Sequence, residues 1–122
     1  MPGQLVLIVD DNATNVKLVR DVLQFKGYGT LVADTGETAV ALAREHLPAL
    51  ILMDVQLPGS SGTEATNILK ADVATRRIPV IALTALAMKG ARESLLADGF
   101  DGYISKPIEL KQLLEMIRGY LG

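Results

Sequence analysis

The feature of this sequence that most constrains its fold is a regular alternation of short apolar runs with longer stretches of helical spacing. The apolar runs are rich in β-branched residues and have the length of buried strands. They cover Leu5–Val9, Thr30–Ala33, Leu50–Met53, Val80–Leu83 and Gly102–Ile104. The stretches between and after them repeat apolar residues every three or four positions. They predict helices over about Thr14–Lys26, Thr35–Glu45, from Ser61 onward, Lys89–Asp98 and Glu109–Tyr120.

Strands that alternate with helices predict a parallel sheet with helices on both faces. A length of 122 residues suits one domain, so we expect residues 1–122 to form a single unit. Right-handed crossovers leave few arrangements of five strands. We therefore expect a doubly wound (βα)5 α/β sandwich of the flavodoxin-like type, with strand order 2-1-3-4-5. Ligands of such sheets bind beyond the carboxyl ends of the strands, between strands one and three.

Several residues mark where the helices should begin and end. Gly27 follows the first predicted helix, at the place where a left-handed residue commonly ends one. Ser61-Gly62-Thr63-Glu64 has the pattern of a capping box, which predicts a helix start. The first helix could be capped by Asp10, Asp11 or Asn12, because all three residue types serve as caps.

Composition excludes several classes of function. The chain has 12 Lys and Arg against 14 Asp and Glu, a net charge of −2, which opposes binding to nucleic acid. The absence of Cys excludes disulfides and thiolate sites, and the single histidine, His46, excludes a multi-histidine metal site. The longest apolar runs have five residues, too few for a membrane span or a signal peptide. Together these features predict a cytoplasmic protein with no membrane partner.

Three carboxylates should meet at the crevice that the topology selects. Asp10 and Asp11 follow the first predicted strand, and Asp54 follows the third. Each alone could be a helix cap or a solvated loop residue, but carboxylates that lie close together repel unless a cation or a proton intervenes. Oxygen ligands without His or Cys favour a hard cation, Mg²⁺ more than Ca²⁺.

The fourth and fifth strands bring groups that can bind an anion to the same edge. Thr84 follows the fourth predicted strand, and Ser105-Lys106-Pro107 follows the fifth, with Pro107 predicting a turn. Three Asp and one Lys sum to −3 + 1 = −2, which one Mg²⁺ would neutralise. A phosphoryl group suits such a cluster, because its oxygens can contact a metal ion, an ammonium group and a hydroxyl at once.

Asp10-Asp11, Asp54, Thr84-Ala85 and Lys106-Pro107, in this order on this pattern of strands and helices, resemble the receiver domain of two-component response regulators. The resemblance covers nearly the whole chain and implies the CheY-like form of the fold. The chain is similar to stand-alone regulators of cell polarity and also to receivers of hybrid histidine kinases and phosphorelays. The resemblance implies a phosphoacceptor signalling switch that catalyses only its own phosphorylation and autodephosphorylation.

The resemblance also implies roles for single residues. Asp54 would be the nucleophile that accepts a phosphoryl group from the phosphohistidine of a histidine kinase or a histidine phosphotransfer protein. Asp10, Asp11, Asp54 and the backbone carbonyl of Gln56 would hold Mg²⁺, for which Mn²⁺ could substitute. Lys106 would pair with the bound phosphoryl group.

Thr84 and Tyr103 would be the switch residues, Thr84 by a hydrogen bond to the phosphoryl group and Tyr103 by a change of rotamer. A downstream protein would bind the face of the fourth helix, fifth strand and fifth helix, and the chain would be a monomer or a weak dimer. Gln56 and Leu86 would occupy the positions that modulate hydrolysis of the acyl phosphate. The sequence leaves open whether the receiver stands alone or is part of a hybrid kinase.

Other classes fit the sequence less well. A haloacid-dehalogenase-type phosphatase needs a second acid two residues after its nucleophile, where this chain has Gln56. A flavin-binding flavodoxin needs a Ser/Thr/Gly-rich loop after the first strand, where this chain has Asp10-Asp11-Asn12. No Walker loop or dinucleotide-binding glycine motif is present. A pseudo-receiver that binds partners without phosphorylation remains the main alternative.

Overall fold

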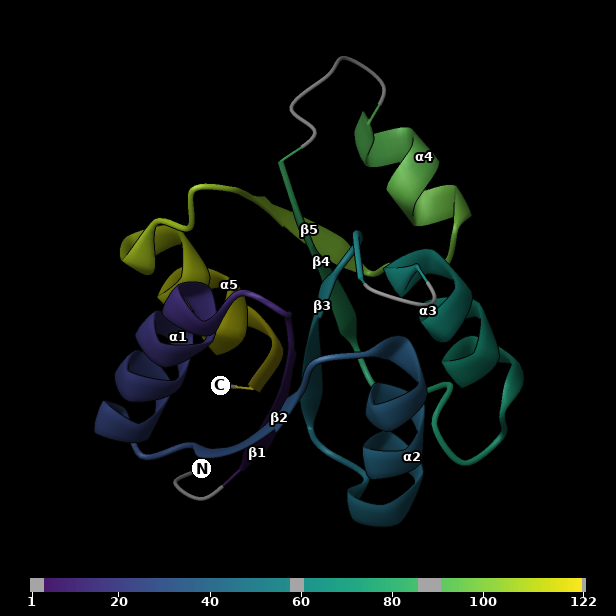
Figure 1. Cartoon of the computed structure of the whole chain (residues 1–122), viewed down its shortest axis with the longest axis horizontal. Coiled ribbons are helices and arrows are strands. Elements are labelled where there is room, and N and C mark those ends of the chain that lie inside the picture. The colour runs from purple at the N-terminus through teal and green to yellow at the C-terminus, as the bar shows by residue number, and fades with distance from the viewer. Residues whose placement is uncertain (1–3, 58–60, 86–90, 122) are drawn as a thin grey trace.

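A computed structural model describes residues 4–57, 61–85 and 91–121 of the chain. Five parallel strands form one sheet in the order β2-β1-β3-β4-β5, as predicted (Figure 1). The strands are β1 (Leu5–Val9), β2 (Gly29–Ala33), β3 (Leu50–Asp54), β4 (Val80–Thr84) and β5 (Gly102–Ser105). The helices are α1 (Ala13–Phe25), α2 (Gly36–His46), α3 (Gly62–Ala71), α4 (Ala91–Ala97) and α5 (Leu110–Leu121).

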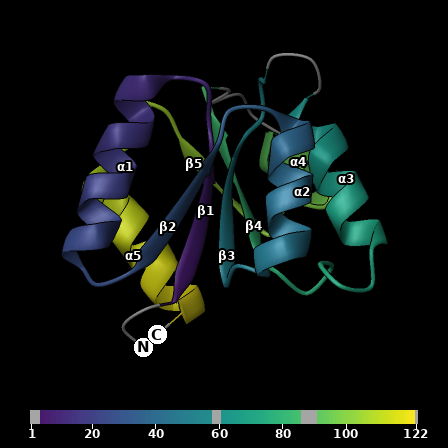
Figure 2. The same cartoon turned by 60° about the horizontal axis from the view of Figure 1, so that its bottom comes forward.

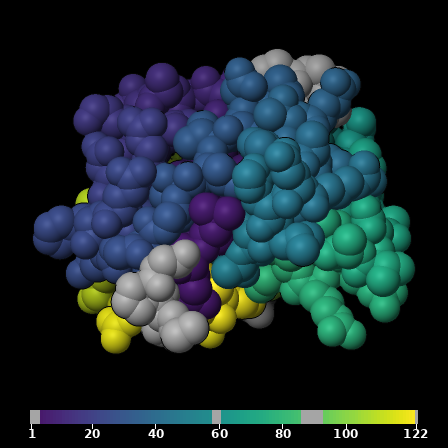
Figure 3. Space-filling model, turned by 90° about the horizontal axis from the view of Figure 1, so that it is seen from below, coloured from purple at the N-terminus to yellow at the C-terminus, as the bar shows by residue number. Residues whose placement is uncertain are grey.

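The helices cover the sheet from both sides. Figure 2 shows α1 and α5 on one face and α2, α3 and α4 on the other. The space-filling view from below shows residues of α1 and of α2 and α3 on opposite sides of the molecule (Figure 3). Each face has its own cluster of buried apolar side chains, so the core is divided by the sheet. All five residues of β3 and of β4 are buried, which explains why these strands are apolar runs without polar alternation.

The helix starts follow their capping residues. Asn12 caps α1, because its side-chain oxygen accepts hydrogen bonds from the N–H groups of Thr14 and Asn15 at 3.0 and 3.1 Å. Ser61 caps α3 by accepting from the Glu64 N–H at 3.1 Å, as its sequence pattern predicts. Gly27 adopts a left-handed φ of 92° after α1, which confirms the expected helix end.

Two boundaries differ from the sequence prediction in a way that concerns the site. Asp54 and Thr84 are the last residues of β3 and β4 rather than the first residues beyond them. The sequence prediction ended both strands one residue early because Asp54 and Thr84 are polar. In the structure the strand pairing continues through Asp54, which pairs with Leu83. The predicted start of the fourth helix near Lys89 lies outside the described residues. Within the described part of the chain, no helix combines the length and apolar character needed to cross a membrane.

Gly62 holds the start of α3 against the backbone of β3. Its N–H donates to the Val55 carbonyl at 2.9 Å. A Cβ at this position would lie 2.0 Å from the carbonyl oxygen of Asp54 and 2.9 Å from its carbonyl carbon. Both atoms belong to the main chain and cannot rotate away. Only glycine therefore allows α3 to begin so close to the strand that carries Asp54.

We predict that Gly62→Ala lowers the free energy of unfolding by about 1–3 kcal/mol, because the new methyl group overlaps fixed backbone atoms. Gly119→Ala is the matched control. It lies in α5 with no atom within 4 Å of the position of a Cβ. There alanine should raise the free energy of unfolding by up to about 1 kcal/mol through its higher helix propensity. Urea denaturation of both variants tests this, and equal effects at the two positions would contradict it.

Candidate functional site: a carboxylate cluster with a lysine

The carboxylates predicted to meet do so at the carboxyl edge of the sheet. Asp10 and Asp11 follow β1 and Asp54 ends β3, and these two strands are neighbours in the sheet. One carboxylate oxygen from each of the three residues lies within 4.8 Å of the others. Asp10 and Asp54 are only 2% and 4% exposed, whereas Asp11 is exposed. The cluster therefore has two buried charges and one that faces solvent.

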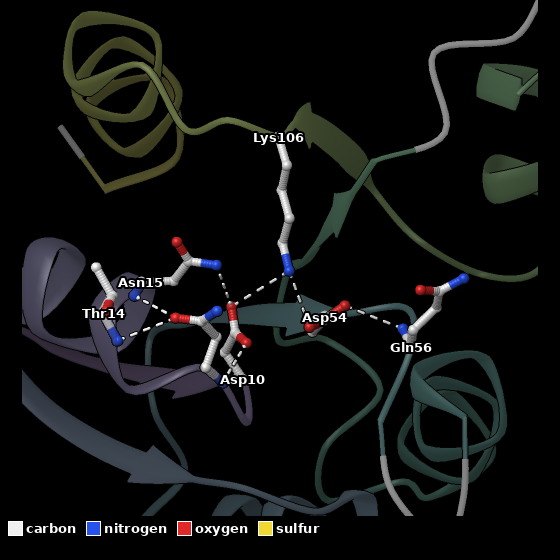
Figure 4. A network of polar contacts seen from close by, with 7 residues as sticks. Asp10, Thr14, Asn15, Asp54, Gln56 and Lys106 are labelled. Carbon is white, nitrogen blue, oxygen red and sulfur yellow. Dashed lines mark hydrogen bonds and ion pairs between the residues drawn. The ribbon is translucent and has the colours of Figure 1, made fainter.

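Lys106 is the cation that faces these carboxylates. It follows β5, and its Nζ lies 2.9 Å from Oδ2 of Asp54 and 3.5 Å from Oδ2 of Asp10 (Figure 4). Its backbone N–H donates to the carbonyl of Thr84 at 2.7 Å, which attaches this segment to the end of β4. The Lys106–Pro107 peptide bond is cis. A single ammonium group is thus shared by the two buried carboxylates.

Backbone and amide donors orient the same two carboxylates. The Gln56 N–H donates to Oδ1 of Asp54 at 3.0 Å, and the Asn12 N–H donates to Oδ1 of Asp10 at 2.9 Å. The side-chain amide of Asn15 lies 3.5 Å from Oδ2 of Asp10 (Figure 4). Each buried carboxylate thus has one oxygen held by the main chain and one directed toward Lys106.

Burial and charge oppose each other at Asp54. Burial raises the pKa of its carboxyl group, and the negative charge of Asp10 adds to this, while the hydrogen bonds from Lys106 and Gln56 lower it; the net direction is upward. For Lys106, burial lowers the pKa of the ammonium group, but the hydrogen bond to Asp54 and the charges of Asp10 and Asp54 outweigh this and raise it. Lys106 is therefore held in its cationic form, and its contact with Asp54 does not outweigh the effect of burial on the pKa of that carboxyl group.

An open cleft of about 740 Å³ gives access to the cluster. Its walls include the predicted residues Asp11, Asp54, Gln56, Thr84 and Lys106. Asp10 is not among the residues that line the cleft, but its carboxylate contacts Lys106, which is. Thr84 is 3% exposed at the end of β4. The cleft is large enough for a phosphoryl group together with part of a donor.

The cleft also contains residues that sequence reasoning did not assign to it. Asn12, Leu57, Ser61 and Glu64 line it as well. The sequence did contain a signal for Asn12 and Ser61. Each caps the helix that follows a strand, so each lies near the side chain at the end of that strand. That signal indicates helix capping and does not by itself indicate a ligand site.

Tyr103, the predicted switch residue, lies outside this cleft. It is half-buried in β5 and packs against the core cluster on the α2–α4 face. It lines a second cleft of about 340 Å³ with residues of α4 and α5. Leu86, expected to modulate hydrolysis, lies outside the described residues.

The carboxylate cluster fits a hard divalent cation. The candidate ligands are all oxygen atoms, they lie within one coordination sphere of each other, and Asp11 opens the cluster to solvent from which water can complete the shell. Burial, with a smaller effect from the charge of Asp10, raises the pKa of Asp54, so a nearby cation would stabilise its ionised form. The structure therefore brings together the acidic residues of the predicted magnesium site. That the backbone carbonyl of Gln56 is a further ligand of the metal ion stays a prediction.

Comparison with known families decides what kind of domain carries this site. The model of the response regulator receiver domain matches residues 6–118 of the chain. The chain belongs to the response regulator receiver family. The fold is accordingly the CheY-like one that the sequence resemblance implied. Receiver domains are signalling proteins of two-component systems rather than enzymes that act on other substrates.

Relatives and solved structures support the same assignment. The chain is 52% identical over 117 residues to the polar-differentiation response regulator DivK of Brucella ovis, covering 96% of this chain and 95% of the relative. It is 36% identical, with a TM-score of 0.89 and 97% coverage of both chains, to the receiver domain of the sensor histidine kinase PA1611 of Pseudomonas aeruginosa PAO1, solved with magnesium in its active-site cleft.

A third similar structure contains a partner protein. It is the Saccharomyces cerevisiae complex of the histidine phosphotransfer signalling protein Ypd1 with the receiver domain of its downstream response regulator Ssk1. The chain is 29% identical to its match there, with a TM-score of 0.88 and coverage of 98% of this chain and 89% of the other. Receivers of this family thus interact with histidine-based phosphodonor proteins and bind Mg²⁺ in an acidic cleft.

We predict that Mg²⁺ stabilises this receiver and that Asp11→Asn removes most of this effect. A ligand that binds only the folded state, at ten times its dissociation constant, adds about 1.4 kcal/mol to the free energy of unfolding. The melting temperature should rise with added Mg²⁺ in the wild type and much less in the variant. Asp21→Asn, an exposed carboxylate on α1, is the control and should respond like the wild type. An Asp11→Asn variant that gained as much from Mg²⁺ would contradict the assignment.

Proposed function

We propose that this receiver is the phosphoacceptor of a two-component phosphorelay, with Asp54 as the residue that is phosphorylated. The observation that carries the proposal is the position of the Asp54 carboxylate. It lies at the floor of an open cleft, is bonded by Lys106 on one oxygen and by the Gln56 N–H on the other, and has Asp10 and Asp11 beside it. The PA1611 receiver, with magnesium in its cleft, supports the same use of this site.

The proposed reaction transfers a phosphoryl group from a phosphohistidine to Asp54. A carboxylate oxygen of Asp54 attacks phosphorus, a P–O bond forms, and the P–N bond to the imidazole breaks. The imidazole nitrogen takes a proton as it leaves, and Asp54 becomes an acyl phosphate. The donor is proposed to be a histidine kinase or a histidine phosphotransfer protein, as the complex of Ypd1 with the Ssk1 receiver suggests.

The residues around Asp54 suit the charge that develops in this reaction. Negative charge spreads over the equatorial oxygens of the transferring group, and Lys106 is positioned to stabilise it. Asp10, Asp11, Asp54 and the Gln56 carbonyl are proposed to hold Mg²⁺, with Mn²⁺ as a substitute. A bound divalent ion would supply positive charge to the phosphoryl oxygens.

Phosphorylation would then bias the residues at the rim of the cleft. The new group carries a charge of about −2 where the carboxylate carried −1. Its oxygens can accept hydrogen bonds from the Thr84 hydroxyl and the Lys106 ammonium, which draws the end of β4 toward Asp54. Tyr103 would respond by a change of rotamer in the second cleft, and a downstream protein would bind there, on the face of α4, β5 and α5.

The remaining expectations belong to the same proposal. Residues 1–122 would act as one receiver domain, as a monomer or weak dimer, and output would depend on protein contacts. The receiver would catalyse only its own phosphorylation and autodephosphorylation. The cytoplasmic location stays a prediction from the sequence.

Acetyl phosphate with Mg²⁺, followed by intact-mass measurement, tests the proposal. We expect the wild type to gain one phosphoryl group and Asp54→Asn to gain none, because the amide is not a nucleophile. Asp21→Asn should be modified like the wild type. An unmodified wild type at saturating magnesium would favour the pseudo-receiver alternative. A modified Asp54→Asn would place the acceptor elsewhere.

Lys106→Met should slow the reaction, because the variant lacks the cation that faces the transferring group. Loss of one stabilising donor of this kind costs about 10²-fold in rate. Lys111→Met is the matched control, since Lys111 is exposed on α5 and does not line the cleft. Rates are compared by following the mass adduct over time. Equal slowing in both variants would contradict a role for Lys106 in transfer.

A further inference from the structure

A second group of charged and aromatic residues lies far from Asp54. Helices α1 and α5 lie side by side on one face of the sheet (Figures 1 and 2). Near the ends of these two helices, a cleft of about 250 Å³ is lined by Lys26, Tyr28, Leu114 and Arg118. Because α1 starts beside Asp10 and has 13 residues, its far end is about 20 Å from the carboxylate cluster. The two sites are therefore separate.

The cleft has an apolar floor and a cationic rim. Tyr28 is half-buried and packs against the core cluster of this face, and Leu114 is also half-buried. Lys26 and Arg118 are exposed, and neither forms an ion pair within 4.0 Å in the described part of the chain. Two cations without acidic partners on a chain of net charge −2 favour an anionic partner at this place.

Phe25 adds an exposed aromatic side chain to the same surface. It is the most exposed large apolar residue among those described, at 85%. The Nζ of Lys26 lies 5.9 Å from the centre of its ring, so the aromatic side chain and the cationic rim adjoin. Cations at helix C-termini are favoured by the helix dipole, which accounts for Lys26 and Arg118 singly. The helix dipole does not explain why the large aromatic side chain of Phe25 is exposed to solvent next to Lys26.

We propose that the Lys26–Arg118 cleft, together with Phe25, binds an acidic segment of a partner protein that carries an apolar side chain. The apolar side chain would lie on Tyr28 and Leu114 and against Phe25, and flanking carboxylates would pair with Lys26 and Arg118. Because this cleft shares no lining residue with the Asp54 cleft, we expect the docking to be independent of phosphorylation. It leaves the phosphoacceptor cleft free while the partner is bound.

A second copy of this chain fits the cleft less well. A symmetric contact through this surface would bring Lys26 and Arg118 of one copy close to the same two cations of the other. Such like-charge contacts oppose association. An acidic segment removes the repulsion and satisfies both cations, which is why we assign it as the occupant.

The test uses two fluorescein-labelled peptides, Asp-Glu-Leu-Phe-Glu-Asp and its neutral counterpart Asn-Gln-Leu-Phe-Gln-Asn. We expect saturable binding of the acidic peptide, with amide chemical-shift changes concentrated at Lys26–Tyr28 and Leu114–Arg118. The neutral peptide and the double variant Lys26→Glu/Arg118→Glu should each weaken binding about tenfold, as expected for loss of two exposed charge pairs. Phe25→Ala should weaken it as well.

The control double variant Lys111→Glu/Arg77→Glu changes the net charge equally but leaves the cleft intact, so it should bind like the wild type. Asp54→Asn, and wild type treated with acetyl phosphate and Mg²⁺, should also bind with unchanged affinity. Equal loss in the control, shift changes centred on Lys106, or self-association through Phe25 would overturn the proposal. Failure here would not affect the phosphoacceptor assignment, which rests on the mass adduct at Asp54.

Discussion

The site depends on the crowding of like charges at one edge of a parallel sheet. The strand order makes β1 and β3 neighbours, so the carboxylates of Asp10 and Asp54 face each other in a buried place. Such a pair is unfavourable without positive charge, and among the described residues Lys106 is the one cation in contact with it. This shortage of positive charge is the reason for proposing that the cleft binds a cation and, with that cation bound, a phosphoryl group.

Much of this arrangement could be predicted from the sequence, because buried parallel strands appear as apolar runs and polar residues at their ends share an edge. The strand order and the acidic cluster followed from that pattern, and the helix end at Gly27 followed from the tendency of glycine to end helices. The contribution of Gly62 could not be predicted, since it depends on a close approach between α3 and the Asp54 carbonyl. Distances between segments far apart in the chain, such as Lys106 to Asp54, also required the structure.

The two charged regions of the molecule differ in how they are built. At the carboxylate cluster, every buried charge has hydrogen-bond partners that fix its direction. At the Lys26–Arg118 cleft, the charges are exposed and no described carboxylate lies within ion-pair distance of them. The first arrangement suits a group that must be placed accurately for reaction, and the second suits contact with a flexible chain. Under the two proposals made above, the receiver would be held by a partner at one end while it reacts at the other.

The position of Asp54 on β3 limits how this receiver can transmit a signal. β3 is fully buried and is hydrogen-bonded to β1 on one side and β4 on the other. Amide protons in such a strand exchange with solvent only when the whole domain opens. The backbone of β3 therefore has little freedom to move when the chemical state of the Asp54 side chain changes. If Asp54 is phosphorylated as proposed, the signal has to leave through the side chains and loops at the rim of the cleft.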